Sequence, residues 1–434
     1  MITAIELQNF KSFGPTNTVV ATAPLTLLVG ANGSGKTTVL EALGVLIQSS
    51  ADRSRSDLVF KGDRVQLDRE HAFHRAMSTS KLRLGLRVSV PQFGLNEWLR
   101  TAEELSYAFA TQATDRAGSR RDVEQELQVD GHALARAWTR FKHTARGAAS
   151  RESGVSLADG PPIGNAFRAE AVLNGEAFQP DGGAANTEQQ DTLRRIGNAV
   201  DHLATGLQQR VTFLSEVRGG DLFLHQTGTV VSSAGRHGED TIRLLTIAWA
   251  DSKKREQLKR LEHWASVFGL PKLTGGWVGS SDLALNFTDS RNNTALPIAS
   301  AGGGSKQVLP FLVEALTASS PRVFCVDEIE HGLHPALLVQ LAALFAEVVG
   351  NGHQIIATTQ SPTLVLAVCA EVARAHVRPD QVALTAVAPN QDGEAEVRRL
   401  AVSASGSIED GWLAEYAEVE RQLLGSFIGG AAGE

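Results

Sequence analysis

The segment Gly30–Thr38, GANGSGKTT, is the part of the sequence whose chemistry is easiest to infer. It matches the pattern GxxxxGK(S/T) and follows Leu25–Val29, an apolar run typical of a buried parallel strand. Glycines let backbone N–H groups curl around phosphate oxygens, and the helix that follows adds partial positive charge at its N-terminus. Lys36 can reach the β- and γ-phosphates of ATP, and the Thr37 hydroxyl can bind Mg²⁺. The predicted nucleotide-binding residues are Asn32, Gly33, Ser34, Gly35, Lys36, Thr37 and Thr38.

Two carboxylates follow a second apolar run. Residues Val323–Val326 are apolar, and Asp327 and Glu328 come directly after them. In open α/β sheets, ligands bind at the carboxyl ends of the strands. One carboxylate suits the coordination shell of Mg²⁺, and the next can polarise a water molecule for attack on a γ-phosphate. We therefore expect Asp327 to bind the metal together with Thr37, and Glu328 to be the catalytic base.

A third segment, Ser300–Gln307 (SAGGGSKQ), directly precedes a predicted amphipathic helix. Its glycines, Gly302, Gly303 and Gly304, expose backbone N–H groups at the start of that helix, where a second anion could bind. A chain needs only one phosphate loop to hold one nucleotide. The second segment therefore favours a composite pocket in which two protomers enclose ATP, although a flexible glycine turn would look the same.

Strands and helices alternate over much of the chain, which favours an α/β fold with a mainly parallel sheet. The 434 residues allow two to three domains, or one domain with a large insertion. Residues 96–149 are rich in Ala, Glu, Arg and Gln and predict helices, 150–190 predict loops, and a helix resumes at 187–209. We divide the chain into an N-terminal lobe (1–95), a mainly helical insertion (96–210), a C-terminal lobe (211–390) and an acidic C-terminal segment (391–434).

The composition excludes a mainly disordered, a collagen-like and a disulfide-scaffold chain. Hydrophobic residues make up 42% and charged residues 21%, as in ordinary soluble proteins. We find neither an apolar run of the ~18–20 residues that span a bilayer nor a signal peptide, so we expect a cytoplasmic protein without a membrane partner. The two cysteines, Cys325 and Cys369, lie in apolar surroundings without metal-ligand spacing, which indicates buried thiols.

The net charge of −7 is unevenly distributed. Residues 51–100 carry 10 Lys/Arg against 6 Asp/Glu, and a second basic cluster occupies Lys253–Arg260. Such clusters are usually solvated helix or strand faces, and the alternative is contact with a nucleic-acid backbone.

In their order and spacing, the motifs resemble those of ABC-type ATPases of the SMC, RecF and overcoming-lysogenization-defect class. The resemblance rests on IELQNFKSFG, GANGSGKTT, SAGGGSKQVLP, VFCVDEIEHGLHP and IIATTQSP, and VTFLSEVRG and GRHGED look like middle segments of stand-alone bacterial members. It covers residues 1–95 and 211–390. It implies a P-loop NTPase fold of the ABC/SMC-head type, with an N-terminal antiparallel β-subdomain.

The resemblance also implies roles for individual residues. Lys36 and Thr37 would be the Walker A residues, Asp327 the Walker B carboxylate and Glu328 the base. The segment from Gly302 through Ser305 to Gln307 would be the signature loop, which acts on the partner's ATP. Leu333–Pro335 would be the D-loop, and Asn9–Lys11 would lie near the nucleotide.

The sequence departs from the family pattern at two places. In Thr359–Pro362, Gln360 replaces the family's switch histidine, and glutamine can donate a hydrogen bond but cannot carry a proton. We therefore expect slow hydrolysis. Gly302 replaces the usual serine of the signature loop, so Ser300 or Ser305 would have to supply that contact. The Q-loop residue stays open between Gln66 and His74.

Three functions remain. The first is a DNA-linked, ATP-driven dimeric switch in antiphage defence or DNA repair, which controls a separate effector such as a nuclease. The 44 residues after position 390 contain no DxD motif, so a fused nuclease domain is not expected. The second is a nucleotide-binding scaffold with very slow hydrolysis. The third is a transporter ATPase subunit, which the opening strand and the large insertion disfavour.

Overall fold

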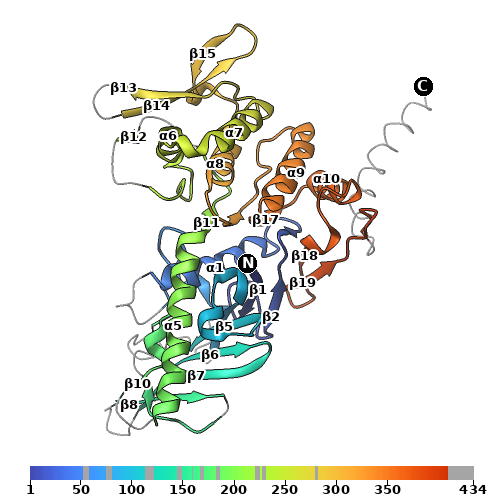
Figure 1. The fold of residues 1–434 in the computed structure, drawn as a ribbon. Helices are drawn as coiled ribbons and strands as arrows, with labels where there is room; N and C mark the ends of the chain where they lie inside the picture. Colours follow the sequence, from blue (N-terminus) through green and yellow to red (C-terminus); the bar gives the residue numbers. More distant parts are fainter. Residues whose placement is uncertain are drawn as a thin grey trace, which may run out of the picture.

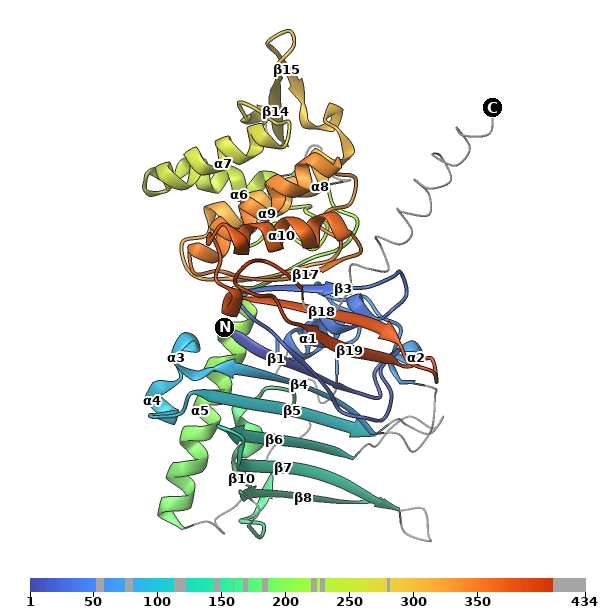
Figure 2. The same ribbon diagram turned by 90° about the vertical axis from the view of Figure 1, so that its right-hand side faces the viewer.

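The computed structural model describes residues 1–51, 58–74, 81–112, 122–143, 149–158, 160–166, 171–181, 186–219, 225–226, 231–278 and 282–408. Two large sheets and the helices around them form an elongated molecule (Figures 1 and 2). Among the described residues, no helix is long and apolar enough to cross a membrane.

The central sheet has the strand order β11-β16-β17-β3-β18-β19. The strands are β3 Leu25–Val29, β11 Val211–Leu214, β16 Val323–Val326, β17 Gln354–Thr359, β18 Val382–Pro389 and β19 Ala395–Leu400. All described pairs are parallel except β18–β19. Every residue of β3, β11, β16 and β17 is buried, which explains their apolar sequences. Since these four strands run in the same direction, their carboxyl ends meet at one edge.

The second sheet is antiparallel and has the order β2-β1-β4-β5-β6-β7-β8 (Figure 2). Its strands are β1 Ile2–Gln8, β2 Thr18–Ala21, β4 Lys81–Ser89, β5 Glu104–Gln112, β6 Val123–Val129, β7 His132–His143 and β8 Ala149–Leu157. In β4 the predicted alternation is confirmed, because Leu82, Leu84 and Leu86 are fully buried whereas Arg83 and Arg87 point away from the core.

The helices belong to two apolar cores. α1 (Lys36–Ser49) and α5 (Thr187–Arg210) pack with the antiparallel sheet. The other long helices pack with the central sheet from its opposite face: α6 Thr241–Ala250, α7 Arg255–Val267, α8 Gly303–Thr317, α9 Pro335–Gly350 and α10 Pro362–Ala373. Residues of β3 divide between the cores, because Leu28 faces the first core and Leu27 the second.

The remaining elements are short. A small sheet near α6 and α7 contains β12 His225–Gln226, β13 Thr274–Val278, β14 Asp282–Asp289 and β15 Thr294–Pro297 (Figure 1). The other short helices and strands are α2 Arg69–Ala72, α3 Val90–Phe93, α4 Asn96–Leu99, β9 Asn165–Ala166 and β10 Pro180–Asp181.

The prediction of helices over residues 96–149 is wrong. Apart from the single turn α4, the described residues of this region form strands β5 to β8, and β8 extends into the predicted loop region. Helix-favouring composition is misleading here, because Leu105, Tyr107 and Phe109 alternate along β5 and are each at most 1% exposed. The outward charges pair across strands, as Arg83 does with Glu126 at 2.8 Å.

The helical end of the insertion is confirmed as α5. Its N-terminus carries a capping box, in which the Asn186 side chain accepts from the Gln189 N–H and the Gln189 side chain accepts from the Asn186 N–H. The predicted C-terminal segment begins too early, because residues 395–400 are strand β19 of the central sheet. Residues 409–434 lie outside the described part. The predicted fold class, an α/β P-loop NTPase with a mainly parallel central sheet and an N-terminal antiparallel sheet, is confirmed.

Candidate functional site

Four strands of the central sheet deliver polar residues to the same edge. β3 leads into the phosphate loop, β16 into Asp327 and Glu328, β17 into Gln360, and β11 into Glu216. The loop requires glycine at two positions. Gly33 and Gly35 have φ of +76° and +108°, and a Cβ on Gly35 would lie 2.7 Å from the Ser12 hydroxyl oxygen.

The phosphate loop leaves several groups ready for an anion. The first turn of α1 has no side-chain cap, so its backbone N–H groups need another acceptor. The buried hydroxyl oxygens of Ser12 and Ser34 have no partner among the described residues. The Lys36 ammonium donates to the carbonyls of Gly30 (3.0 Å) and Ala31 (2.9 Å), which holds it over the loop. These features fit the phosphates of a nucleotide.

The predicted metal ligands lie together. The Thr37 hydroxyl donates to both carboxylate oxygens of Asp327, at 3.0 and 3.1 Å. The fully buried Thr358 donates to Asp327 Oδ1 at 2.5 Å and fixes the carboxylate from the other side. A hydroxyl beside a carboxylate is the hard oxygen donor set that Mg²⁺ prefers, so Thr37 and Asp327 fit the metal.

Glu328 has an unusual backbone and an unusual environment. Its φ is +41°, its N–H donates to the Thr358 hydroxyl (2.9 Å), and its carboxylate accepts from the Gln360 side-chain amide (3.2 Å). Burial raises the pKa of Glu328, and the nearby charges of Glu216 and Glu330 raise it further. A carboxylate with a raised pKa is a better proton acceptor near neutral pH.

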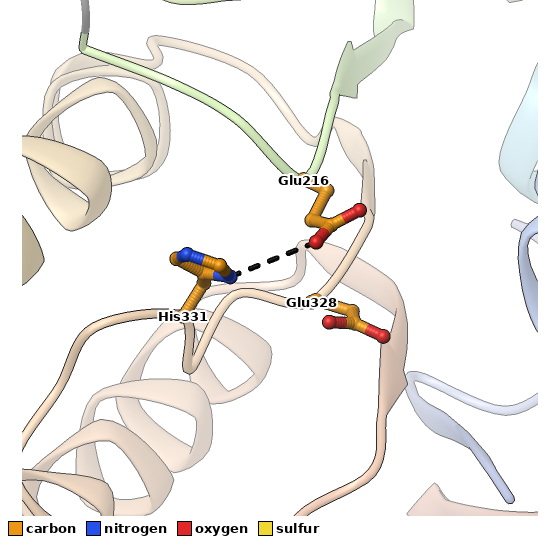
Figure 3. Close-up of side chains that lie close together, drawn as sticks. All are labelled: Glu216, Glu328 and His331. Atoms are coloured by element: carbon orange, nitrogen blue, oxygen red, sulfur yellow. Dashed lines mark ion pairs between the residues drawn. The ribbon is translucent and has the colours of Figure 1, made fainter. Parts of the chain in front are cut away.

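Glu216 and His331 flank Glu328 at the open side of the site (Figure 3). Ligand atoms of the three residues lie within 4.8 Å of one another, and His331 Nδ1 is 3.7 Å from Glu216 Oε1. The sequence motifs assigned no role to Glu216. Glu216 lies two residues after the buried apolar strand β11, a signal similar to the one that identified Asp327, and it could have been used in the same way.

These groups border one cleft of about 640 Å³. It is lined by Lys11, Ser12, Asn32, Gly33, Gly35, Lys36, Thr37, Thr38, Glu216, Glu328, His331 and Gln360. Lys11 therefore lies near the nucleotide site as expected, and it forms a 2.5 Å ion pair with Glu41 on α1.

Other predicted residues lie outside this cleft. The segment Gly302–Ser305 begins α8 and packs against the loop at Gly332, where a Cβ on Gly304 would lie 2.3 Å from the Gly332 carbonyl oxygen. Neither Q-loop candidate lines the cleft. His74 Nδ1 donates to the Lys11 carbonyl (2.7 Å), and Gln66 donates to the Gly62 carbonyl (2.8 Å).

Two parts of the sequence match known families. Residues 4–85 match a family described as "AAA domain", and residues 193–367 match one described as "AAA domain, putative AbiEii toxin, Type IV TA system". Both matched parts are similar to AAA domains. The phosphate loop lies in the first matched part, and the acidic pair and the segment Gly302–Gln307 lie in the second.

Solved structures of SMC head domains are similar to this chain over most of its length. An SmcHead bound to the C-winged helix domain of ScpA is 17% identical, with a TM-score of 0.48 and coverage of 92% of this chain and 98% of that one. The SMC head domain from Thermotoga maritima is 13% identical, with a TM-score of 0.40 and coverage of 92% and 98%. At this level of similarity, the fold assignment rests on the strand order and the phosphate loop of the chain itself. No curated protein shows significant sequence similarity to it.

Proposed function

We propose that this protein binds ATP with Mg²⁺ and hydrolyses it slowly, as a dimeric switch in a DNA-linked process. The observation that carries the proposal is that Lys36, Thr37 and Glu328 line one cleft, where Thr37 donates to Asp327 from a segment almost 300 residues away in sequence. Residues brought together from such distant segments are in the arrangement that phosphoryl transfer needs.

Different residues of the site have different roles in this reaction. The phosphate loop and Lys36 bind the phosphates, while Thr37 and Asp327 hold Mg²⁺. When bound, Mg²⁺ supplies positive charge that neutralises the phosphate oxygens. Glu328 accepts the proton of the attacking water. Because Gln360 donates to Glu328 Oε2, we assign Oε1 to that water.

The dimer explains why the signature segment lies outside the cleft. Gly302 and Gly303 are exposed, as are His334 and Pro335 after the acidic pair. Two apolar side chains in the same part of the molecule are also exposed, Val217 at 61% and Val339 at 40%. A second copy of the chain would cover these residues and bring its signature segment to the nucleotide.

The basic clusters and the family description bear on the DNA link and on the effector. Lys81, Arg83 and Arg87 of the first basic cluster pair with carboxylates on other strands of the same sheet, β6 for the first two and β1 for Arg87. In the second cluster, Lys259 pairs with Glu256 and Arg260 with Glu347. These pairs favour solvated faces over a dedicated phosphate-binding surface. The family description that names a toxin of a type IV TA system supports a role in defence, with a separate protein as the effector.

The test is the ATPase rate of the purified protein with and without duplex DNA. We expect slow hydrolysis that requires Mg²⁺ and Lys36, and an increase on adding DNA. Tight ATP binding without turnover in either condition would favour the scaffold function. Turnover that Lys36→Ala leaves unchanged would contradict the proposed site.

A further inference from the structure

Arg218 is a buried cation next to the acidic site. It follows β11, three residues after Ser215, and is 1% exposed. Burial lowers the pKa of Arg218 to about 10, and nearby carboxylates, Asp327 first, oppose this effect. It is therefore charged at neutral pH. Because it balances the carboxylates from inside the protein, Glu216, Glu328 and His331 do not need a metal ion to lie close together.

The hydrogen bonds of Arg218 join three separate segments. Its guanidinium donates to the carbonyls of Ser215, Asp327 (2.6 Å) and Glu328 (3.2 Å), and through Nε to the carbonyl of Gln307 (3.0 Å). Its backbone N–H donates to the Gln307 side chain at 2.7 Å. Gln307 belongs to the first turns of α8, the helix that begins with the signature segment. The Arg218 side chain thus connects α8 to the backbone of both Asp327, the proposed metal ligand, and Glu328, the proposed base.

The contact with Glu328 is the one with consequences for catalysis. Left-handed backbone is unfavourable for a residue other than glycine and persists only where neighbours hold it. At Glu328, Thr358 holds the N–H and Arg218 holds the carbonyl. A shift of Arg218 would therefore move the Glu328 carboxylate relative to the attacking water.

We propose that Arg218 is a positioning residue that couples α8 to the catalytic base. When the signature segment binds the partner's nucleotide, the first turn of α8 is fixed, and Gln307 transmits this through Arg218 to the Glu328 backbone. Each protomer then hydrolyses ATP efficiently only when its own signature segment is engaged. The inference rests on the proposed function, specifically on the two-protomer site.

The test compares ATP affinity, kcat and the Hill coefficient for ATP in the wild type, four single variants and one double variant. Arg218→Lys keeps the charge but loses the forked geometry, and Gln307→Leu removes the side-chain acceptor. Gln307→Glu keeps an acceptor oxygen and serves as the rescue variant. Arg322→Lys is the matched control, because Arg322 pairs with the buried Glu314 (2.9 Å) near the C-terminal end of α8, away from the signature segment, and does not line the cleft.

We expect Arg218→Lys and Gln307→Leu to keep ATP affinity within about twofold, to lose roughly tenfold in kcat, and to lose cooperativity. The double variant should be no worse than the more severe single variant, because the two residues act in series. Gln307→Glu should recover most of the rate, and Arg322→Lys should retain cooperativity.

Two results would overturn the coupling while leaving the ATPase intact. One is a wild-type kcat and Hill coefficient in both coupling variants. The other is the same loss in Arg322→Lys, which would show a general structural effect. Failure of the proposed function looks different, because the wild-type protein itself would then lack Lys36-dependent hydrolysis.

Discussion

Thr358 forms hydrogen bonds with both Asp327 and Glu328, and its replacement by valine should impair both metal binding and catalysis. The hydroxyl donates to Asp327 and accepts from the Glu328 N–H, and the side chain is fully buried. Valine has nearly the same shape, so the change removes the hydrogen bonds and little else.

The expected cost follows from these two bonds. A hydrogen bond to a charged group contributes about 1.5–3 kcal/mol, and a buried N–H without an acceptor costs about 1–3 kcal/mol. The added methyl group recovers about 0.8 kcal/mol. Because the two losses share one hydroxyl and overlap, we expect a net loss of about 2–4 kcal/mol in local stability. If half of this acts on Asp327, the Mg²⁺ concentration for half-maximal activity rises about tenfold.

The assay is the ATPase rate as a function of Mg²⁺, with the thermal unfolding midpoint measured in parallel. Thr358→Ser should behave like the wild type because it keeps the hydroxyl. Thr26→Val is the matched control, since Thr26 is also fully buried in the central sheet but bonds only to Ala23. It should lower the unfolding midpoint without changing the Mg²⁺ dependence. An unchanged Mg²⁺ dependence and kcat in Thr358→Val would refute the reasoning.

Three further variants probe the cleft directly. Lys36→Ala should weaken ATP binding about 10- to 100-fold in calorimetric titration, because it removes a charged donor to the phosphates; equal affinities would contradict the assignment. Glu328→Gln should bind ATP but lose about 100-fold or more in kcat, and light scattering should show an ATP-dependent dimer. In the wild type, the acidic limb of the kcat profile should lie above the usual pKa of glutamate, because burial raises that of Glu328. Gln360→His should raise kcat about tenfold if the switch position limits turnover, and an unchanged rate with and without DNA would exclude this.

The motifs at strand ends could be predicted because each depends on local sequence alone. A buried strand followed by GANGSGKTT or by Asp327-Glu328 has one reasonable arrangement, and the strand order of the sheet then brings them together. The role of Arg218 could not be found this way. Its hydrogen bonds join the loop after β11 to α8 and to the loop after β16, and such long-range hydrogen bonds leave no periodic pattern in the sequence.

The prediction of helices in the insertion was wrong for a different reason. Its alanines, glutamates and arginines have high helix propensity, but tertiary packing decides the structure of a strand whose inner face is buried. Tyr107 shows this, because its hydroxyl donates to Gln125 on the next strand (2.7 Å) and accepts from the Leu173 N–H (2.8 Å). Once these strands extend the sheet, their outward charges form cross-strand pairs, such as those of Lys81 with Glu124 and Arg83 with Glu126.

Hydrogen bonds of the loop that carries Gln360 determine where this side chain lies at the switch position. Glu330 accepts from both the Thr359 hydroxyl and the Gln360 N–H, so the loop after β17 is tied to the loop after β16. This contact places the Gln360 amide against Glu328. The amide nitrogen has two N–H donors, so one N–H binds the base and the second remains for a γ-phosphate oxygen. Glutamine can therefore keep a phosphate contact, but it lacks the proton that a histidine could carry, and this difference is the reason for the slow turnover that we expect.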